Sequence, residues 1–287
     1  MTTAGSSDER ASTRHKEEDV YDYQIGLEDV DLPVAEKHFF DIAGYVVLKD
    51  LLSPSEVDVA RKSSLAALAE RDIGDGEVVH VIERGGVLED AMALPPVIER
   101  VKQFIWGRQH RLVGSRVIVR GSGESSTLIQ GGAADPRRYA RYRCFGDGQF
   151  RCLLLTCLIA LQDTTAADGA LCVLPSSHKA NLPHPYADVP LNKIEALRDV
   201  ELRAGSGVLL TENLSRAMSP YASGSNSKPH VWLAYHYGTS YMVNWPGCDA
   251  SDELIERCAS DEAKSHLLLP PYYHPAGAQL RGVINAD

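Results

Sequence analysis

The chain has 287 residues, of which 44% are hydrophobic and 24% are charged, and its formal net charge is −10. This is the composition of an ordinary globular protein. The negative charge argues against a nucleic-acid surface, because phosphate binding needs clustered lysine and arginine. The longest apolar run, residues 153–161, is too short for a membrane span of roughly 20 residues.

The N-terminal residues 1–30 are polar, and we expect them to form a flexible arm ahead of a single domain over 31–287. They lack the apolar core of a secretory signal. The six cysteines form no CxxC pair, and several lie in apolar runs. We therefore expect a cytoplasmic protein with buried free thiols.

A strand and two helices are expected in the first third of the chain. Residues 44–52 (GYVVLKDLL) predict a short strand, and the following Ser53-Pro54-Ser55-Glu56 supplies an N-cap, a proline at the first helical position and an acidic first turn. Apolar residues then recur at helical spacing over 57–69. A second helix is expected over 96–105.

From residue 112 onward the pattern changes to short β-rich runs separated by Gly, Asp and Asn. These runs are 113–121, 150–163, 169–178, 205–213 and 230–238. A short helix over 191–198 and a longer one over 251–267 are also expected. Several strands after a helical start, without strand–helix alternation, predict a mainly β fold with flanking helices. The expected core is an antiparallel sandwich or jelly roll.

Two motifs resemble one known family. Leu161-Gln162-Asp163 followed by GALCVLPSSHK (169–179) is similar to the L-x-D … G-(A/G)-(L/F)-x-V-x-P-G-S-H-K signature of the phytanoyl-CoA dioxygenase family of iron(II)/2-oxoglutarate oxygenases. Ser176 stands where glycine is usual. Residues 39–61 also resemble the family's N-terminal segment. The resemblance covers roughly residues 38–245 and implies a double-stranded β-helix of the cupin type.

The resemblance also implies an iron site from which this chain departs. The family presents His-x-Asp or His-x-Gly on one strand and a second histidine on a later one, leaving positions open for 2-oxoglutarate and oxygen. The matching places here are Gln130-Gly131-Gly132 and Arg216. A guanidinium stays protonated and repels Fe²⁺. The stretch 229–236 lacks the arginine that clamps 2-oxoglutarate in the family, so we expect neither metal nor cofactor.

The candidate site residues surround this altered centre. Arg216 either pairs with Glu212 as a structural contact or places its charge in the former metal cavity, where it could hold an anionic substrate or an enolate. The basic, aromatic segment 137–143 is either a solvated loop or a lid over the cavity. The residues expected to take part in catalysis are Gln130, Arg216, His230, His236 and Tyr235. Those expected to bind substrate are Gly132, Arg138, Tyr139, Arg141, Tyr142, Glu212 and Trp232.

One question about the last strand stays open. Side chains alternate between the two faces of a strand, so His230 and His236 share one face and Tyr235 and Tyr237 share the other. If His236 faces inward, it is the best acid–base candidate, because histidine exchanges protons near neutral pH. The pattern does not decide which face is inside. His178 is interpreted as a structural turn residue.

The favoured function is a non-oxidative, cofactor-independent step on a small, natural-product-like molecule. Cyclisation, isomerisation, a pericyclic step and dehydration all fit. Catalysis would then rest on holding a reactive conformer and stabilising charge as it develops. Two alternatives stay open: an iron(II)/2-oxoglutarate oxygenase with unusual ligands, and a non-catalytic binding protein. The expected partner is a small-molecule substrate, without nucleic acid or membrane.

Overall fold

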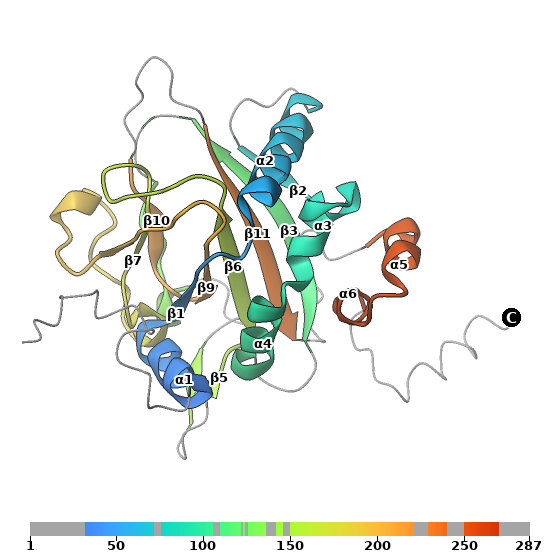
Figure 1. The fold of residues 1–287 in the computed structure, drawn as a ribbon. Coiled ribbons are helices and arrows are strands. Elements are labelled where there is room, and N and C mark those ends of the chain that lie inside the picture. The colour runs from blue at the N-terminus through green and yellow to red at the C-terminus, as the bar shows by residue number, and fades with distance from the viewer. Residues whose placement is uncertain are drawn as a thin grey trace, which may run out of the picture.

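Two antiparallel sheets form the centre of the protein (Figure 1). The larger sheet has the strand order β1-β9-β6-β11-β3-β2, and the smaller has the order β10-β7-β8. Every strand pair in them is antiparallel. The strands are β1 Tyr45–Leu48, β2 Gly76–Val79, β3 His110–Arg120, β6 Leu154–Ala160, β7 Leu171–Val173, β8 Arg198–Val200, β9 Gly207–Thr211, β10 Arg216–Met218 and β11 His230–Thr239. A separate hairpin pairs β4 (Arg143–Cys144) with β5 (Phe150–Arg151). The predicted antiparallel jelly-roll architecture is confirmed.

This computed structural model describes residues 32–71, 76–105, 110–121, 123, 126–135, 142–145, 150–220, 229–239 and 250–269. No helix within these ranges is long and apolar enough to cross a membrane. The expected N-terminal arm, residues 1–30, lies outside the described residues.

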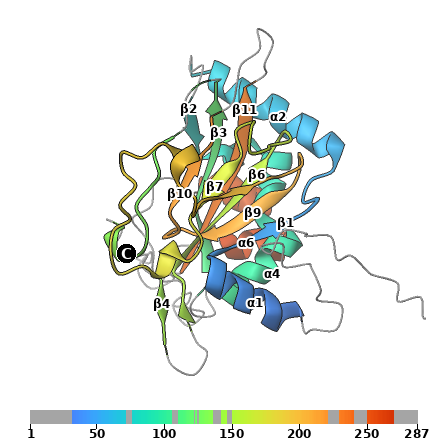
Figure 2. The same ribbon diagram turned by 90° about the vertical axis from the view of Figure 1, so that its left-hand side faces the viewer.

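Helices cover one face of the large sheet, and the small sheet covers the other (Figures 1 and 2). The helices are α1 Leu32–Ala43, α2 Pro54–Ala69, α3 Val87–Asp90, α4 Pro95–Phe104, α5 Asp252–Cys258 and α6 Glu262–Leu267. Short 3₁₀ turns are η1 Val81–Arg84, η2 Ala91–Ala93, η3 Gly132–Ala134, η5 Ser177–Lys179 and η6 Leu191–Lys193. The start of α2 is as predicted: the Ser53 side chain accepts from the Glu56 backbone N–H, and the Glu56 carboxylate accepts from the Ser53 backbone N–H at 2.8 Å.

Strand β11 separates two apolar cores. Leu233 and Tyr235 belong to the cluster under the helices. Trp232 and Ala234 belong to the cluster between the two sheets. Because side chains alternate along a strand, His236 faces the space between the sheets together with Trp232 and Ala234. The structure therefore decides the question that the sequence left open.

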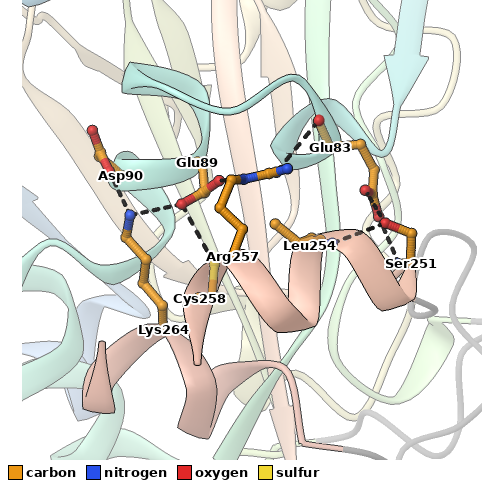
Figure 3. Close-up of polar contacts among 8 residues, drawn as sticks. All are labelled: Glu83, Glu89, Asp90, Ser251, Leu254, Arg257, Cys258 and Lys264. Atoms are coloured by element: carbon orange, nitrogen blue, oxygen red, sulfur yellow. Dashed lines mark hydrogen bonds and ion pairs between the residues drawn. The ribbon is translucent and has the colours of Figure 1, made fainter. Parts of the chain in front are cut away.

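The C-terminal helices α5 and α6 are held against α3 by one buried carboxylate (Figure 3). Glu89 is 5% exposed and accepts from Arg257 at 2.6 Å and from Lys264 at 2.8 Å. Ser251 caps α5 and donates its hydroxyl to Glu83 at 2.6 Å. Burial alone would raise the pKa of Glu89, but the hydrogen bonds from Lys264 and Arg257 lower it overall.

Three local expectations need correction. The helix expected over 191–198 is wrong: only the turn η6 forms, and Ile194 then adopts an extended backbone and packs with Leu128 and Ala217. The helix expected over 251–267 is divided into α5 and α6. Helix α1 was not predicted. Of the described cysteines, Cys144 is exposed and the other four are buried and free, while Cys248 lies outside the described residues.

Candidate active site

A partly open cavity of about 540 Å³ lies between the two sheets. The large sheet contributes inward-facing residues from β2, β3, β6 and β11, and the small sheet contributes residues from β7 and β10. The lining combines aliphatic side chains with charged and hydroxyl groups from the same strands. The described residues that line it are Glu77, Arg116, Ile118, Arg120, Ser126, Ile129, Thr156, Leu158, Leu171, Glu212, Arg216, Ala217, Met218, Ala234 and His236.

Four polar side chains from four parts of the chain form a continuous hydrogen-bonded line in this cavity wall. His236 Nδ1 on β11 lies 2.9 Å from the Thr156 hydroxyl on β6. That hydroxyl donates to Glu212 Oε2 at 2.5 Å, and Glu212 Oε1 accepts from Arg216 Nη2 at 2.7 Å. Thr156, Glu212 and His236 are 1%, 2% and 5% exposed, whereas the Arg216 side chain is 13% exposed. Arg216 is thus the member that a substrate can reach most easily.

The chemistry of the acceptor decides how protons are placed along this line. An ionised carboxylate only accepts hydrogen bonds, so the Thr156 hydroxyl must give its single proton to Glu212. The remaining Thr156 lone pairs can then only accept, so the proton of the other bond resides on His236 Nδ1. The line therefore has one direction: each group donates toward Glu212, and Arg216 donates from the opposite side.

Backbone contacts hold Arg216 in place as well. Its Nη1 donates to the carbonyl oxygens of Glu212 at 3.1 Å and of Leu214 at 3.3 Å. The Arg216–Glu212 ion pair bridges the turn between β9 and β10, four residues apart. The structural interpretation of Arg216 is therefore confirmed by its pairing with Glu212, and Arg216 also lines the cavity.

The two segments matched to the family's iron ligands meet in this structure. The Ile129 backbone N–H donates to the Arg216 carbonyl oxygen at 3.0 Å, and both side chains line the cavity. Gln130, the residue matched to the first histidine, has its amide bonded to His184, and Arg216 is a cation, so neither supplies the imidazole ligand of the family pattern. The described residues contain no group of three His, Cys, Asp or Glu side chains that could hold a metal ion.

Close backbone packing leaves no space for a carboxylate at the neighbouring glycines. A Cβ on Gly131 would lie 2.6 Å from Ser215 Oγ, and one on Gly132 would lie 2.7 Å from the Ser177 carbonyl oxygen. Gly132 also has a φ of +57°, in the left-handed region. Gly132 is therefore a packing point between η3 and η5. The donor set at this junction does not fit the iron centre that the family pattern implies.

Two candidates near this junction bond elsewhere. The Gln130 amide donates to the His184 carbonyl oxygen and accepts from the His184 backbone N–H, both at 3.1 Å, so the structure does not bring Gln130 to Arg216. Tyr142 donates its hydroxyl to Asp41 at 2.7 Å. Burial, followed by the bond to Asp41, raises the pKa of Tyr142 well above its usual range. Arg138, Tyr139 and Arg141 lie outside the described residues.

The remaining candidates lie on β11 at a distance from the polar line. Tyr235 is on the helix side of the sheet and donates to the Leu88 carbonyl oxygen at 2.8 Å. Trp232 is fully buried in the core between the sheets. His230 Nε2 lies 3.6 Å from Asp168 Oδ1, and burial lowers the pKa of His230 although Asp168 opposes the shift. Of the β11 candidates, only His236 joins Arg216 and Glu212.

Most of the lining was not expected from the sequence, and Thr156, Arg116 and Arg120 are its polar residues for which a signal was present. Thr156 is the one hydroxyl residue in the apolar run 153–161, which was a usable signal. Arg116 and Arg120 alternate with Val117 and Val119 along β3, and the valines pack in the helix-side core while the arginines line the cavity. A two-residue period would have placed both arginines on one face of that strand.

Comparisons with known proteins agree with the architecture. Residues 40–217 match the family model described as "Phytanoyl-CoA dioxygenase (PhyH)". No curated protein matches the chain. Among solved structures, HygX from Streptomyces hygroscopicus with nickel and 2-oxoglutarate bound is 21% identical, with a TM-score of 0.64 over 76% of this chain and 91% of that one.

Two enzymes of nogalamycin biosynthesis share the fold as well. The non-heme alpha ketoglutarate dependent epimerase SnoN is 16% identical, with a TM-score of 0.52 over 75% of this chain and 88% of SnoN. The non-heme alpha ketoglutarate dependent carbocyclase SnoK is 15% identical, with a TM-score of 0.53 over 77% of this chain and 88% of SnoK. At these identities the comparisons establish the shared fold.

Proposed function

Because this chain belongs to the phytanoyl-CoA dioxygenase family, we propose that it is an enzyme that keeps the family's cavity but uses it for a cofactor-independent proton transfer. The reaction class is a non-oxidative isomerisation, cyclisation or dehydration of a small natural-product-like molecule. The observation that carries this proposal is the hydrogen-bonded line from His236 through Thr156 and Glu212 to Arg216.

The line provides a route for a proton. In the direction of its donors, a His236 protonated on both ring nitrogens gives its Nδ1 proton to Thr156 as Thr156 gives its own to Glu212. Glu212 then protonates the substrate, and His236 is left neutral with its proton on Nε2. The reverse sequence removes a proton from the substrate. Histidine is the member whose side-chain type gains and loses a proton near neutral pH. Of the described residues that line the cavity, His236 is the one histidine.

Arg216 supplies the other half of the chemistry. A proton shift beside a carbonyl builds negative charge on oxygen, and a fixed cation in a poorly solvated wall stabilises that charge without reorganising. The aliphatic side chains of the lining would hold the substrate in one conformation, which lowers the entropy cost of ring closure. Both effects act in the transition state, as catalysis requires.

Two arguments support a departure from iron chemistry. The positions matched to the two histidines are Gln130, whose amide bonds to His184, and Arg216, and neither offers an imidazole. The Arg216 cation also stands where the family motif has its second histidine, so an iron ion there would face a positive charge. The substrate class follows by analogy with the epimerase and the carbocyclase of nogalamycin biosynthesis, which share the fold.

The test is solvent hydrogen exchange with the full-length protein. A panel of small ketones and β-hydroxy ketones is incubated in D₂O with EDTA, and NMR and mass spectrometry follow deuterium uptake and new isomers. We expect exchange that persists in EDTA, is lost in Thr156→Val and is kept in Thr156→Ser. The Ser variant keeps the hydroxyl, so it is the matched control for the relay.

Other outcomes would decide against the proposal. Stoichiometric iron in the purified protein, with succinate formed from 2-oxoglutarate and activity abolished by EDTA, would identify an oxygenase. A protein that binds members of the panel but never exchanges or converts them would be a binding protein. Equal activity of Thr156→Val and Thr156→Ser would remove the relay from the mechanism.

A further inference from the structure

We propose that the substrate carries a carboxylate that binds side-on to Nε and Nη2 of Arg216, with an aliphatic body seated against the aliphatic side chains of the same cavity. The inference rests on the proposed function only in taking this cavity as the substrate site. It adds the chemical class of the ligand and the edge of the side chain that recognises it.

The hydrogen bonds of Arg216 leave one edge of its guanidinium available. A guanidinium has five N–H donors in a fixed plane. Nη1 uses two of them on the carbonyl oxygens of Glu212 and Leu214, and Nη2 uses one on the Glu212 carboxylate. Since Nη1 and Nη2 both reach Glu212, that residue occupies the edge between them.

The remaining donors are Nε–H and the second N–H of Nη2, which point in parallel from the adjacent edge. Within the described part of the chain, no acceptor meets either of them. Neither Nε nor Nη2 of Arg216 is among the buried atoms that lack a partner, and the Arg216 side chain is 13% exposed and lines the cavity. Two parallel N–H groups match the two oxygens of a carboxylate, which is the bidentate geometry that arginine favours.

The other arginines of the lining are held within the wall. Arg116 is paired with Glu77 at 2.7 Å, and Arg120 donates to the Ser219 carbonyl oxygen at 3.4 Å. Recognition of an anion therefore rests on the remaining edge of Arg216 and not on a net charge of the lining.

The aliphatic side chains of the cavity define the body of the ligand. They include Ile118 and Leu158 on the large sheet and Leu171 and Met218 on the small sheet, and no Phe, Tyr or Trp belongs to the described lining. Burial of an aliphatic chain or ring against such surface is favourable by about 25 cal/mol per Å². A polar head at Arg216 and an apolar body against these side chains together define an amphipathic carboxylic acid.

The experiment measures binding without turnover, using hexanoate as the probe and the full chain. Hexanamide keeps the shape and loses the charge. By isothermal titration and saturation-transfer NMR, we expect hexanoate to bind and hexanamide to bind at least 10-fold more weakly. Arg216→Lys keeps a positive charge but removes the two-pronged edge, so it should weaken hexanoate binding about 10-fold. The exposed Arg84→Lys is the matched control and should bind as the wild type does.

Folding of the variants is checked by thermal unfolding. If Arg216→Lys unfolds, the double variant Arg216→Gln/Glu212→Gln replaces it, because it removes the buried pair together and should bind hexanoate no better than hexanamide. Equal affinity for the two probes in the wild type, or unchanged hexanoate binding in the Arg216 variants, would overturn the inference. If hexanoate binding follows these expectations while deuterium exchange fails, the carboxylate site stands and the proposed function falls.

Discussion

The ion pair between Arg216 and Glu212 makes a quantitative prediction about stability. Glu212 is 2% exposed, and Arg216 reaches its carboxylate at 2.7 Å. Removing one partner of a buried pair costs about 3–5 kcal/mol, because the other charge stays buried without compensation. Since Arg216 keeps some exposure, we expect Arg216→Met to lower the free energy of unfolding by about 3 kcal/mol. At roughly 2–4 °C per kcal/mol for a protein of this size, Tm should fall by about 6–12 °C.

A double-mutant cycle with denaturant unfolding measures the coupling. Arg216→Met/Glu212→Gln removes both charges, so it should be less destabilised than the sum of the two single variants by at least about 1 kcal/mol. The pair Arg84–Glu70 is the matched control, with the same 2.7 Å contact but side-chain exposures of 32% and 61%. Arg84→Met should cost less than about 1 kcal/mol. Strict additivity of the two buried substitutions would refute the reasoning.

Three further predictions follow from other parts of the fold. Burial lowers the pKa of His178 to about 4, below the roughly 6.5 of an unfolded histidine. The neutral ring therefore stabilises the fold fully above about pH 6.5, and this contribution, roughly 3 kcal/mol, is lost as the pH falls toward 4. The free energy of unfolding should therefore change less between pH 7 and pH 4.5 in His178→Gln than in the wild type. In thermal unfolding, Gly132→Ala should be at least about 1 kcal/mol more destabilising than Gly86→Ala. Both glycines have a positive φ, but only at Gly132 would the added Cβ meet other atoms within 4 Å. Equal losses of stability would contradict the packing argument. Tyr235→Phe should cost about 1–2 kcal/mol by leaving the Leu88 carbonyl without its donor, and should leave deuterium exchange intact because it acts on the helix side of the sheet.

The local sequence was sufficient for most of the architecture. The capping box at Ser53 and Glu56 marks the start of α2 because it satisfies backbone donors within four residues. Short β-rich runs with turn residues between them predicted β1, β3, β6, β7, β9 and β11, because a strand's pattern is set by its own alternation. Helices α1 and α3 and the short strands β2, β4, β8 and β10 were missed. These elements are fixed by what they pack against rather than by a strong pattern of their own.

What the sequence by itself determined is the family-like fold and the presence of a cation, Arg216, at a position where the motif has a histidine. Only the tertiary structure decided how that cation is used. Thr156 meets Glu212 and His236 across separations of 56 and 80 residues, and no local pattern encodes such contacts. A period of two assigns His236 and Tyr235 to opposite faces of one strand, but packing against the helices decides which face is the cavity. The polar line exists because β6 and β11 of the large sheet, the turn after β9 and the first residue of β10 in the small sheet lie within hydrogen-bond distance of one another.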